Sequence, residues 1–294
     1  MVHSKTSELT NVLCRGRNAD GGWGYYPGKV SRIEPTCWIA LYLLRASDSE
    51  KDLTTDIVRW FAARQREDGF LDDATGLPPN VGFSALAAIV VGSAGLLPAE
   101  GARRLLGAVY PTKGVASERT RNRQDNTLRG WSWLEDTFSW VEPIAWSLLA
   151  LKKSSALPQR EQSARIEEAE RMLFDRVCRT GGWNHGNSNM FGQELNADIP
   201  ATALALLALQ DRREHPSVQK SIEYLTRQRL AEPAGMALSL TSICLRVYGR
   251  STADVDERLA ALAETHSFFN NQHVAAMALY CLTAHDHDVE DFRL

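Results

Sequence analysis

Three carboxylates lie in similar settings along the chain, each just ahead of an apolar run that a proline opens. Glu34 and Glu142 directly precede prolines, and Asp198 lies two residues before one. The structural interpretation is helix capping, because a helix dipole and free backbone N–H groups favour a carboxylate there. The functional interpretation is a group of carboxylates at a shared cavity, one of which keeps its proton as a general acid. Glu142 is our first choice of acid, because Trp140 and Trp146 give it the more apolar setting.

Seven further residues are candidates for substrate contact, because they are aromatic or ionisable and lie in loops or at helix starts related to these carboxylates. Aromatic rings suit the wall of a cavity for an isoprenoid chain, since they attract a developing carbocation. A histidine and a glutamate lie in residues 183–194, which are dense in hydrogen-bonding groups. Packing, exposure or helix capping is the structural alternative for each. The seven are Tyr25, Trp133, Asp136, Trp140, His185, Glu194 and His273.

The segments that carry these residues repeat, and such repeats decide the architecture. Residues 20–44, 129–151 and 180–209 each contain a glycine–tryptophan turn, a loop and an apolar run. The periodicity predicts six pairs, each an amphipathic helix followed by a more uniformly apolar one. The expected pairs are 7–15 with 35–46, 52–66 with 81–91, 99–109 with 143–152, 161–178 with 200–210, 216–229 with 236–247, and 252–265 with 272–283. Sustained period-two alternation is absent, so the class is all-α.

A helix that is apolar nearly all round must be buried on most sides, so we expect an inner ring of apolar helices inside an outer ring. The prediction is an (α/α)6 toroid forming one domain over residues 1–294, with an open superhelical array as the alternative. Inner helices of a closed ring run parallel, which would gather the candidate residues around one mouth of a central cavity. Residues 111–128 read as a surface loop over one rim, and the acidic tail from residue 285 is expected to fray.

Composition narrows the class of protein. The chain has 294 residues and a net charge of −3, too small a charge to indicate nucleic acid as a partner. Its longest strongly apolar run, residues 85–91, is far shorter than the roughly 20 residues of a membrane span. Residues 1–17 lack the apolar core of a signal peptide, and the five cysteines include no CxxC pair. We therefore expect a cytoplasmic protein without a transmembrane segment.

The turns Asp20-Gly-Gly-Trp23, Arg129-Gly-Trp131 and Gly181-Gly-Trp183 resemble the repeat of squalene–hopene cyclases and protein prenyltransferase β-subunits. The helix openings that begin at Pro35 and Ala201 are similar as well, and the resemblance extends over nearly the whole chain. It implies an (α/α)6 toroid whose central cavity opens where the inner helices begin.

The resemblance also shows where this sequence departs from the family. Class II terpene cyclases protonate an alkene with the middle aspartate of an Asp-x-Asp-Asp-Thr-Ala segment. The most similar segment here keeps Asp198 but has Pro200 and Ala201 at the acid positions. In the first and third repeats, Glu34 and Glu142 stand where the acid would be.

The prenyltransferase zinc site is also incomplete. That family binds zinc through an aspartate, a cysteine two residues later and a distant histidine, and no Asp-x-Cys occurs here. Glu34, Cys37, His185 and His273 could still converge across the ring, since cysteine and histidine are preferred zinc ligands. A cysteine on an apolar helix is usually a packing residue, so we expect no bound zinc and no cofactor.

Three functions follow from these observations. The first is a terpene cyclase-like or prenyltransferase-like enzyme that handles an isoprenoid or other hydrophobic substrate with non-standard acid residues. The second is a non-catalytic toroid that binds a hydrophobic ligand or a protein partner. The third is a carbohydrate-active (α/α)6 enzyme with paired carboxylates. The turns favour the first function over the third, and the missing Asp-x-Asp-Asp motif favours the second over the first. The lining of the cavity would discriminate among them.

Overall fold

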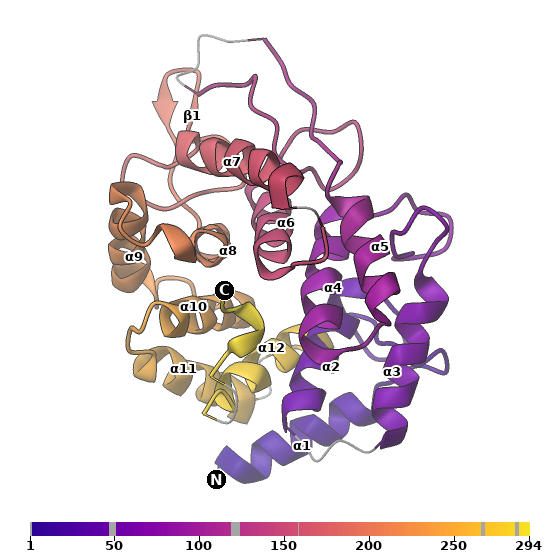
Figure 1. The fold of residues 1–294 in the computed structure, drawn as a ribbon. Helices are drawn as coiled ribbons and strands as arrows, with labels where there is room; N and C mark the ends of the chain where they lie inside the picture. The colour runs from indigo at the N-terminus through magenta and orange to yellow at the C-terminus, as the bar shows by residue number, and fades with distance from the viewer. Residues whose placement is uncertain (1, 47–50, 119–123, 158, 266–267, 286–287) are drawn as a thin grey trace.

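The chain consists mainly of helices that alternate between an inner ring and an outer ring (Figure 1). The computed structural model describes residues 2–46, 51–118, 124–157, 159–265, 268–285 and 288–294. The inner helices are α2 (Ile33–Ala46), α4 (Val81–Ala94), α6 (Val141–Lys153), α8 (Ile199–Ala208), α10 (Gly235–Val247) and α12 (Gln272–Leu282). The outer helices are α1 (Val2–Arg15), α3 (Lys51–Arg64), α5 (Ala99–Val109), α7 (Gln159–Asp175), α9 (Pro216–Gln228) and α11 (Ala253–Glu264). The short elements are β1 (Asn189–Met190), β2 (Gln193–Glu194), η1 (Gln210–Arg212) and η2 (Glu290–Phe292).

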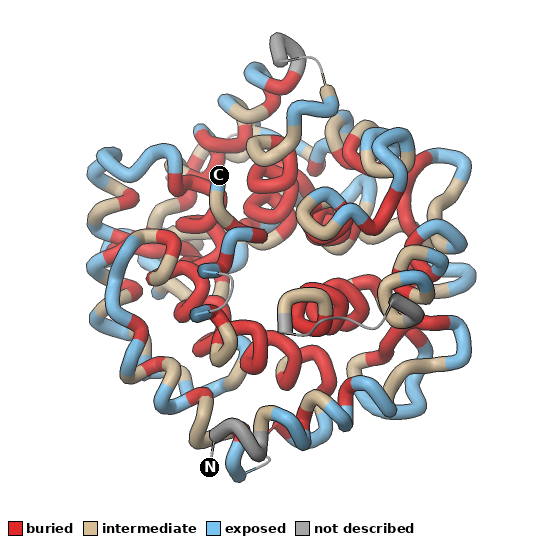
Figure 2. Tube along the Cα trace, turned by 60° about the horizontal axis from the view of Figure 1, so that its bottom comes forward, coloured by how far each residue is buried: buried red, intermediate tan, exposed pale blue. Residues whose placement is uncertain are grey.

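The inner helices form a closed ring. Each packs against the next in chain order, and α12 packs against α2. Figure 2 shows this arrangement, with buried residues along the inner helices and exposed residues concentrated on the outer ones. The contact between the last and first inner helices excludes the open superhelical array. The all-α (α/α)6 toroid predicted from the repeat is confirmed.

The repeated tryptophan has the same structural role in all three turns. The side chains of Trp23, Trp131 and Trp183 are fully buried. Each indole N–H donates a hydrogen bond to a backbone carbonyl in the last turns of the preceding outer helix. The acceptors are Leu13, Val109 and Leu173, at 2.7, 2.9 and 2.7 Å respectively. The tryptophan thus ties the turn to its outer helix, and the inner helix that follows begins from a fixed point.

Backbone hydrogen bonds between neighbouring repeats place the starts of the inner helices at one rim. The first residue of an inner helix donates its N–H to the loop that precedes the adjacent inner helix. The pairs are Val81 to Trp133 at 2.9 Å, Val141 to His185 at 3.0 Å and Gln272 to Tyr25 at 2.8 Å. The three acceptors each lie two residues after the tryptophan of a repeated turn, at Trp131, Trp183 and Trp23. Neighbouring inner helices therefore run parallel, as expected for a closed ring.

An aromatic cluster fills the middle of the ring. Phe292, in η2, is fully buried and stacks on Trp38 with ring centroids 5.3 Å apart. The same ring lies 6.2 Å from Trp146 and 5.8 Å from Tyr280. These partners come from α2, α6 and α12, so the C-terminal segment joins three inner helices (yellow in Figure 1).

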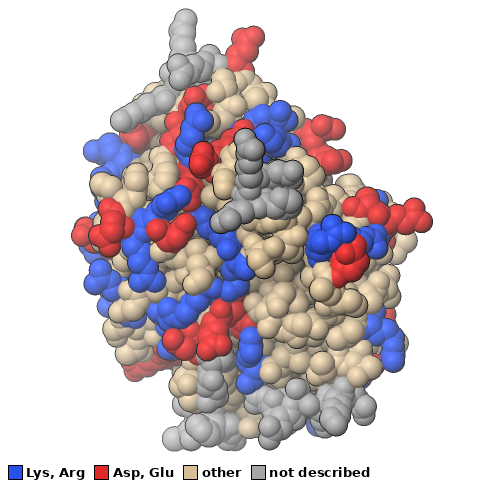
Figure 3. Space-filling view, in the orientation of Figure 1, with Lys and Arg blue, Asp and Glu red and all other residues tan. Residues whose placement is uncertain are grey.

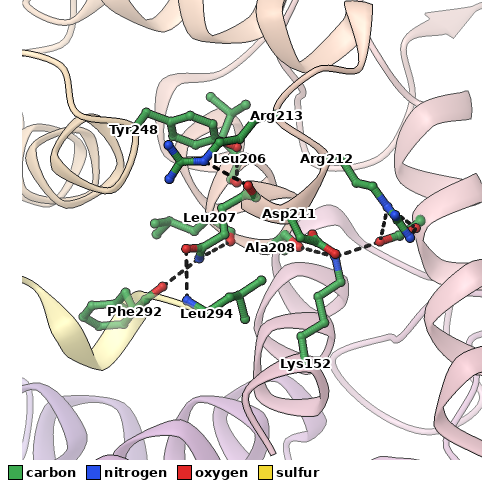
Figure 4. Close-up of polar contacts among 12 residues, drawn as sticks. Lys152, Leu206, Leu207, Ala208, Asp211, Arg212, Arg213, Tyr248, Phe292 and Leu294 are labelled. Carbon is green, nitrogen blue, oxygen red and sulfur yellow. Dashed lines mark hydrogen bonds and ion pairs between the residues drawn. The ribbon is translucent and has the colours of Figure 1, made fainter. Parts of the chain in front are cut away.

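Polar contacts hold this C-terminal segment in place. Asp291 is 1% exposed, forms an ion pair with Arg45 at 2.6 Å and accepts a hydrogen bond from the Tyr280 hydroxyl at 2.8 Å. The Gln210 amide donates to the Phe292 carbonyl at 2.8 Å and accepts from the Leu294 N–H at 3.1 Å (Figure 4). The expectation of a frayed tail is therefore wrong for residues 288–294. The acidic composition of the tail suggested exposure, but the charge of the buried Asp291 is neutralised by Arg45, which is distant in sequence.

Charged side chains are mixed on the surface. On the face drawn in Figure 3, lysines and arginines alternate with aspartates and glutamates instead of forming one field. Within the described residues, no helix combines the length and the apolar character that crossing a membrane requires.

Truncating the buried aromatic ring of the C-terminal segment tests whether that segment is part of the core. Phe292→Ala should lower the free energy of unfolding by about 3–5 kcal/mol, because it removes a fully buried ring and leaves a cavity. The measurement is urea unfolding followed by circular dichroism. Leu294→Ala is the matched control, and with its side chain 48% exposed it should change stability by less than about 0.5 kcal/mol. Equal stability of the two variants would show that the C-terminal segment is frayed and is not part of the core.

Candidate functional site

Three of the candidate residues occupy the same position in different inner helices. Glu34, Glu142 and His273 are each the second residue of their helix, in α2, α6 and α12. Because these helices start at one rim, the repeat places all three side chains there. The structure then pairs each glutamate with a histidine from the neighbouring repeat.

Glu142 is paired with His185. The Nδ1 atom of His185 donates a hydrogen bond to Oε1 of Glu142. The other carboxylate oxygen, Oε2, is buried and has no hydrogen-bond partner among the residues that the structure describes. The Glu142 side chain is 14% exposed, whereas that of His185 is 58% exposed. Trp140 lies beside the imidazole, with ring centroids 5.9 Å apart. The histidine is thus the accessible member of the pair and the glutamate the enclosed one.

The charge of the carboxylates sets the protonation of His185. Burial of the ring lowers its pKa, but the hydrogen bond and charge of Glu142, together with the charge of Asp198, raise it more. The net pKa of His185 lies above its ordinary value. The pair can therefore hold a proton on imidazole close to neutral pH.

Glu34 forms the second pair, which is more deeply enclosed. The Tyr25 hydroxyl donates to Oε2 of Glu34 at 2.6 Å, and Nε2 of His273 lies 3.7 Å from Oε1. His273 is 4% exposed, and its Nε2 makes no hydrogen bond within the described part of the chain. Burial lowers the pKa of His273 although the charge of Glu34 opposes this. Burial, with the charge of Glu34 added, raises the pKa of Tyr25. This cluster holds a neutral histidine.

Asp198 caps a helix. Its Oδ1 accepts a hydrogen bond from the backbone N–H of Ala201 at 2.9 Å, at the N-terminus of α8. Trp133 packs over Gly82, where an added Cβ would come within 2.5 Å of the indole ring. Glycine at that place in α4 leaves room for the tryptophan at the rim.

Two of the predicted substrate residues are exposed. Asp136 lies in the loop before α6, in a left-handed turn with φ of 56°. Glu194 lies on β2 and lines a cavity of about 540 Å³ near the start of α9, together with Lys220.

A cavity of about 660 Å³ lies beside His185. Its walls come from the described positions 115, 117, 124, 126 and 128, from the loop before α6, from the end of α7 and from the loop before α8. Its apolar lining is Val115, Leu128, Phe138, Trp140, Met172 and Leu195. Its amide lining is Gln124, Asn126, Asn184, Asn187 and Asn196. Among the described residues that line the cavity, the ionisable ones are His185 and Arg176, and none of the three candidate carboxylates is included.

Sequence analysis did not identify the 111–128 insert as part of a cavity wall. The 111–128 insert was read as a surface loop, yet its Gln124 is 4% exposed and donates to the Asn187 side chain at 2.6 Å. Three of its arginines, at positions 119, 121 and 123, lie outside the described residues. The asparagines at 184–189 gave the one usable signal, since such a density of amides in one loop indicates a binding surface.

The candidate zinc ligands do not form a cluster. Among the described residues, no group of three histidine, cysteine, aspartate or glutamate side chains could hold a metal ion. Cys37 is fully buried on α2, and burial raises the pKa of its thiol well above the ordinary value. His185 and His273 each pair with a different glutamate.

No protein-family model and no curated protein sequence matches this chain. Solved structures of similar shape include the ligand-free type II terpene cyclase MstE from Scytonema, with a TM-score of 0.61, 15% identity and 98% of each chain covered. An α-amylase from Clostridium perfringens matches with a TM-score of 0.64 and 10% identity, over 94% of this chain and 98% of that one. A glycosidase matches with a TM-score of 0.61 and 11% identity, over 97% of this chain and 96% of that one. At such low identity the likeness shows the fold alone: the chain shares an α/α toroid with terpene cyclases and with glycosidases.

Proposed function

We propose that the protein is an acid–base enzyme that acts on an isoprenoid-class ligand bound in the 660 Å³ cavity. The observation that carries this proposal is the Glu142–His185 pair, whose histidine lies at the cavity wall and whose glutamate lies behind it. An exposed imidazole with a raised pKa, fixed by a carboxylate, is an arrangement suited to proton transfer.

The two members of the pair have different roles in this proposal. His185 is the proton donor and acceptor, because it lines the cavity. Glu142 is a positioning residue, because it binds Nδ1 and leaves Nε2 for the ligand. This arrangement revises the sequence-based choice of Glu142 as the acid. Asp198 adds negative charge near His185, and Glu34 belongs to the separate enclosed pair.

The acidity of an imidazolium limits the chemistry. An imidazolium is a much weaker acid than a carboxylic acid, so it is poorly matched to a bare alkene and better matched to an oxygen atom. We therefore place an oxygen function of the ligand, such as an epoxide or an allylic alcohol, at His185. With an epoxide, the proton would go to oxygen as the C–O bond breaks, a neighbouring double bond would close a ring, and a proton lost from carbon would balance the reaction.

The lining of the cavity fits an amphiphilic ligand. Its apolar residues would contact a prenyl chain, and its five amides would hydrogen-bond a polar head group. A related structure of MstE is described with geranylgeranyl dihydroxybenzoate as substrate, a molecule that has both parts. Because an aromatic cluster occupies the middle of the ring, we propose this cavity, which lies off the ring axis, as the ligand site.

A carbohydrate is the second candidate ligand, and a specific observation favours it. Phe138 and Trp140 are 62% and 41% exposed at the cavity, as rings that stack on sugars are, and the amides could bind hydroxyl groups. The proton would then go to a glycosidic oxygen. The resemblance in shape to a glycosidase and an amylase is compatible with this reaction.

Removing the carboxylate tests the proposed reaction. We expect the purified protein to convert a prenyl epoxide into a cyclised alcohol, an isomer of the substrate that chromatography separates and its fragmentation in mass spectrometry identifies. Glu142→Gln should lower kcat by about 10²–10⁴-fold with a smaller change in KM, because it disturbs the donor more than the cavity. Maltooligosaccharides in a parallel assay test the carbohydrate alternative.

Glu100→Gln is the matched control, because Glu100 is an exposed residue on α5 that pairs only with a surface arginine at 2.6 Å in the described structure. It should retain full activity. Turnover by Glu142→Gln at the wild-type rate would contradict the role of the pair. Hydrolysis of the oligosaccharide without conversion of the epoxide would replace the isoprenoid assignment with the carbohydrate one.

The pH dependence of His185 gives a test that needs no substrate. Its pKa, followed by NMR of the imidazole protons, should fall in Glu142→Gln, because the carboxylate raises it. A folded-state pKa above the unfolded value of about 6.5 stabilises the protein fully below that pH. The stabilisation is lost as the pH rises through the raised pKa, so the stability gap between wild type and variant should narrow above neutral pH. An unchanged pKa would show that the pair does not form in solution.

A further inference from the structure

The cavity of about 540 Å³ takes no part in the proposed reaction. The end of α7 with the turn after it, the β1–β2 hairpin and the start of α9 line it, and these elements are neighbours on one side of the toroid (Figure 1). Gln124 lines both this cavity and the 660 Å³ cavity, so the two cavities share a wall there. Its volume lies in the range of sites for small ligands.

Two cations at the 540 Å³ cavity have no carboxylate partner within the described part of the chain. They are Arg179, in the turn after α7, and Lys220, on α9, and both are exposed. The Nζ atom of Lys220 donates a hydrogen bond to the backbone carbonyl of Arg179 at 2.7 Å, which holds the two residues together. The N-terminal end of α9, which also lines the cavity, adds its partial positive charge. This part of the cavity therefore attracts an anion.

The other ionisable groups of the described lining do not cancel this charge. Asp175 is already paired with Arg176. Burial raises the pKa of Cys178 to about 11, so its thiol is uncharged at neutral pH. Glu194 is exposed on β2, and its single negative charge is smaller than the sum of the two positive charges.

Two buried amides face the same cavity without all their hydrogen bonds. Gln124 is 4% exposed, and its Nε2 donates to the Asn187 side chain, but its Oε1 is buried and has no partner among the described residues. Asn189 is 7% exposed, and its side-chain amide makes no hydrogen bond to any residue that the structure describes. Buried polar groups without partners are rare in native proteins and cost free energy. A ligand with hydroxyl groups would supply the missing partners.

We propose that the 540 Å³ cavity is a second binding site, which takes a small phosphorylated polyol such as a sugar phosphate. The phosphate group contacts Arg179 and Lys220, because paired cations suit its charge and its several acceptor oxygens. The hydroxyl groups of the ligand hydrogen-bond to Gln124 and Asn189. An anion with an apolar tail would leave both amides unpaired, so the site disfavours it. This assignment does not depend on the reaction proposed for the 660 Å³ cavity.

The experiment is isothermal titration calorimetry of the full chain with glucose 6-phosphate, ribose 5-phosphate and glycerol 3-phosphate, and with inorganic phosphate for comparison. We expect at least one of the three esters to bind about tenfold or more tightly than inorganic phosphate, because its hydroxyl groups pair with the amides. Arg179→Gln combined with Lys220→Gln should raise the Kd of that ester about tenfold or more. Asn189→Ala should raise the Kd of the ester and leave that of inorganic phosphate unchanged. Circular dichroism verifies that each variant folds.

Arg59→Gln with Arg103→Gln is the matched control, because it removes the same charge from two exposed arginines on α3 and α5. It should bind the ester as the wild type does. Binding of none of the three esters, binding of inorganic phosphate as tightly as the best ester, or an equal loss in the control would overturn the proposal. Phe138→Ala changes a residue that lines only the other of these two cavities, so it should leave the Kd of the ester unchanged. A loss of binding in that variant would place the ester in the 660 Å³ cavity and would also overturn the proposal.

Discussion

A hydrogen bond between neighbouring repeats determines where the candidate site residues of this protein lie. In α4, α6 and α12, the first N–H has no partner within its own helix and donates instead to the loop before the next inner helix. At α6 that acceptor is the backbone carbonyl of His185, 3.0 Å away. The second residue of the same helix is Glu142, whose carboxylate then meets the His185 side chain. The bond that closes the ring between two repeats thus also assembles the acid–base pair.

The same register gives the two glutamates different environments. Glu34 and Glu142 are equivalent in the repeat, and each meets a histidine, but from different directions. His273 comes from an inner helix and is buried, so burial lowers its pKa. His185 comes from a loop at a cavity and keeps a raised pKa. One repeat therefore yields an enclosed pair whose histidine has a lowered pKa and an open pair whose histidine has a raised one, depending on whether the histidine lies in a helix or in a loop.

The sequence was sufficient for the features that repeat. The tryptophan turns, the alternation of amphipathic and apolar helices and the shared rim all follow from local patterns, and the closed ring follows from them. Features that occur once could not be found this way. The burial of Asp291 depends on Arg45, which is 246 residues away in sequence, and that of Phe292 depends on Trp38. The pairing of Glu142 with His185 and the amides of the cavity wall depend likewise on which loops become neighbours in the ring.

The central claim is that a ligand binds off the ring axis with its oxygen at His185. A crystal structure of the protein with an oxygen-bearing isoprenoid tests this claim most directly. The account predicts ligand density in the 660 Å³ cavity, with the ligand oxygen about 2.6–3.2 Å from Nε2 of His185. Density along the ring axis with Phe292 displaced, or a ligand oxygen remote from His185, would contradict it.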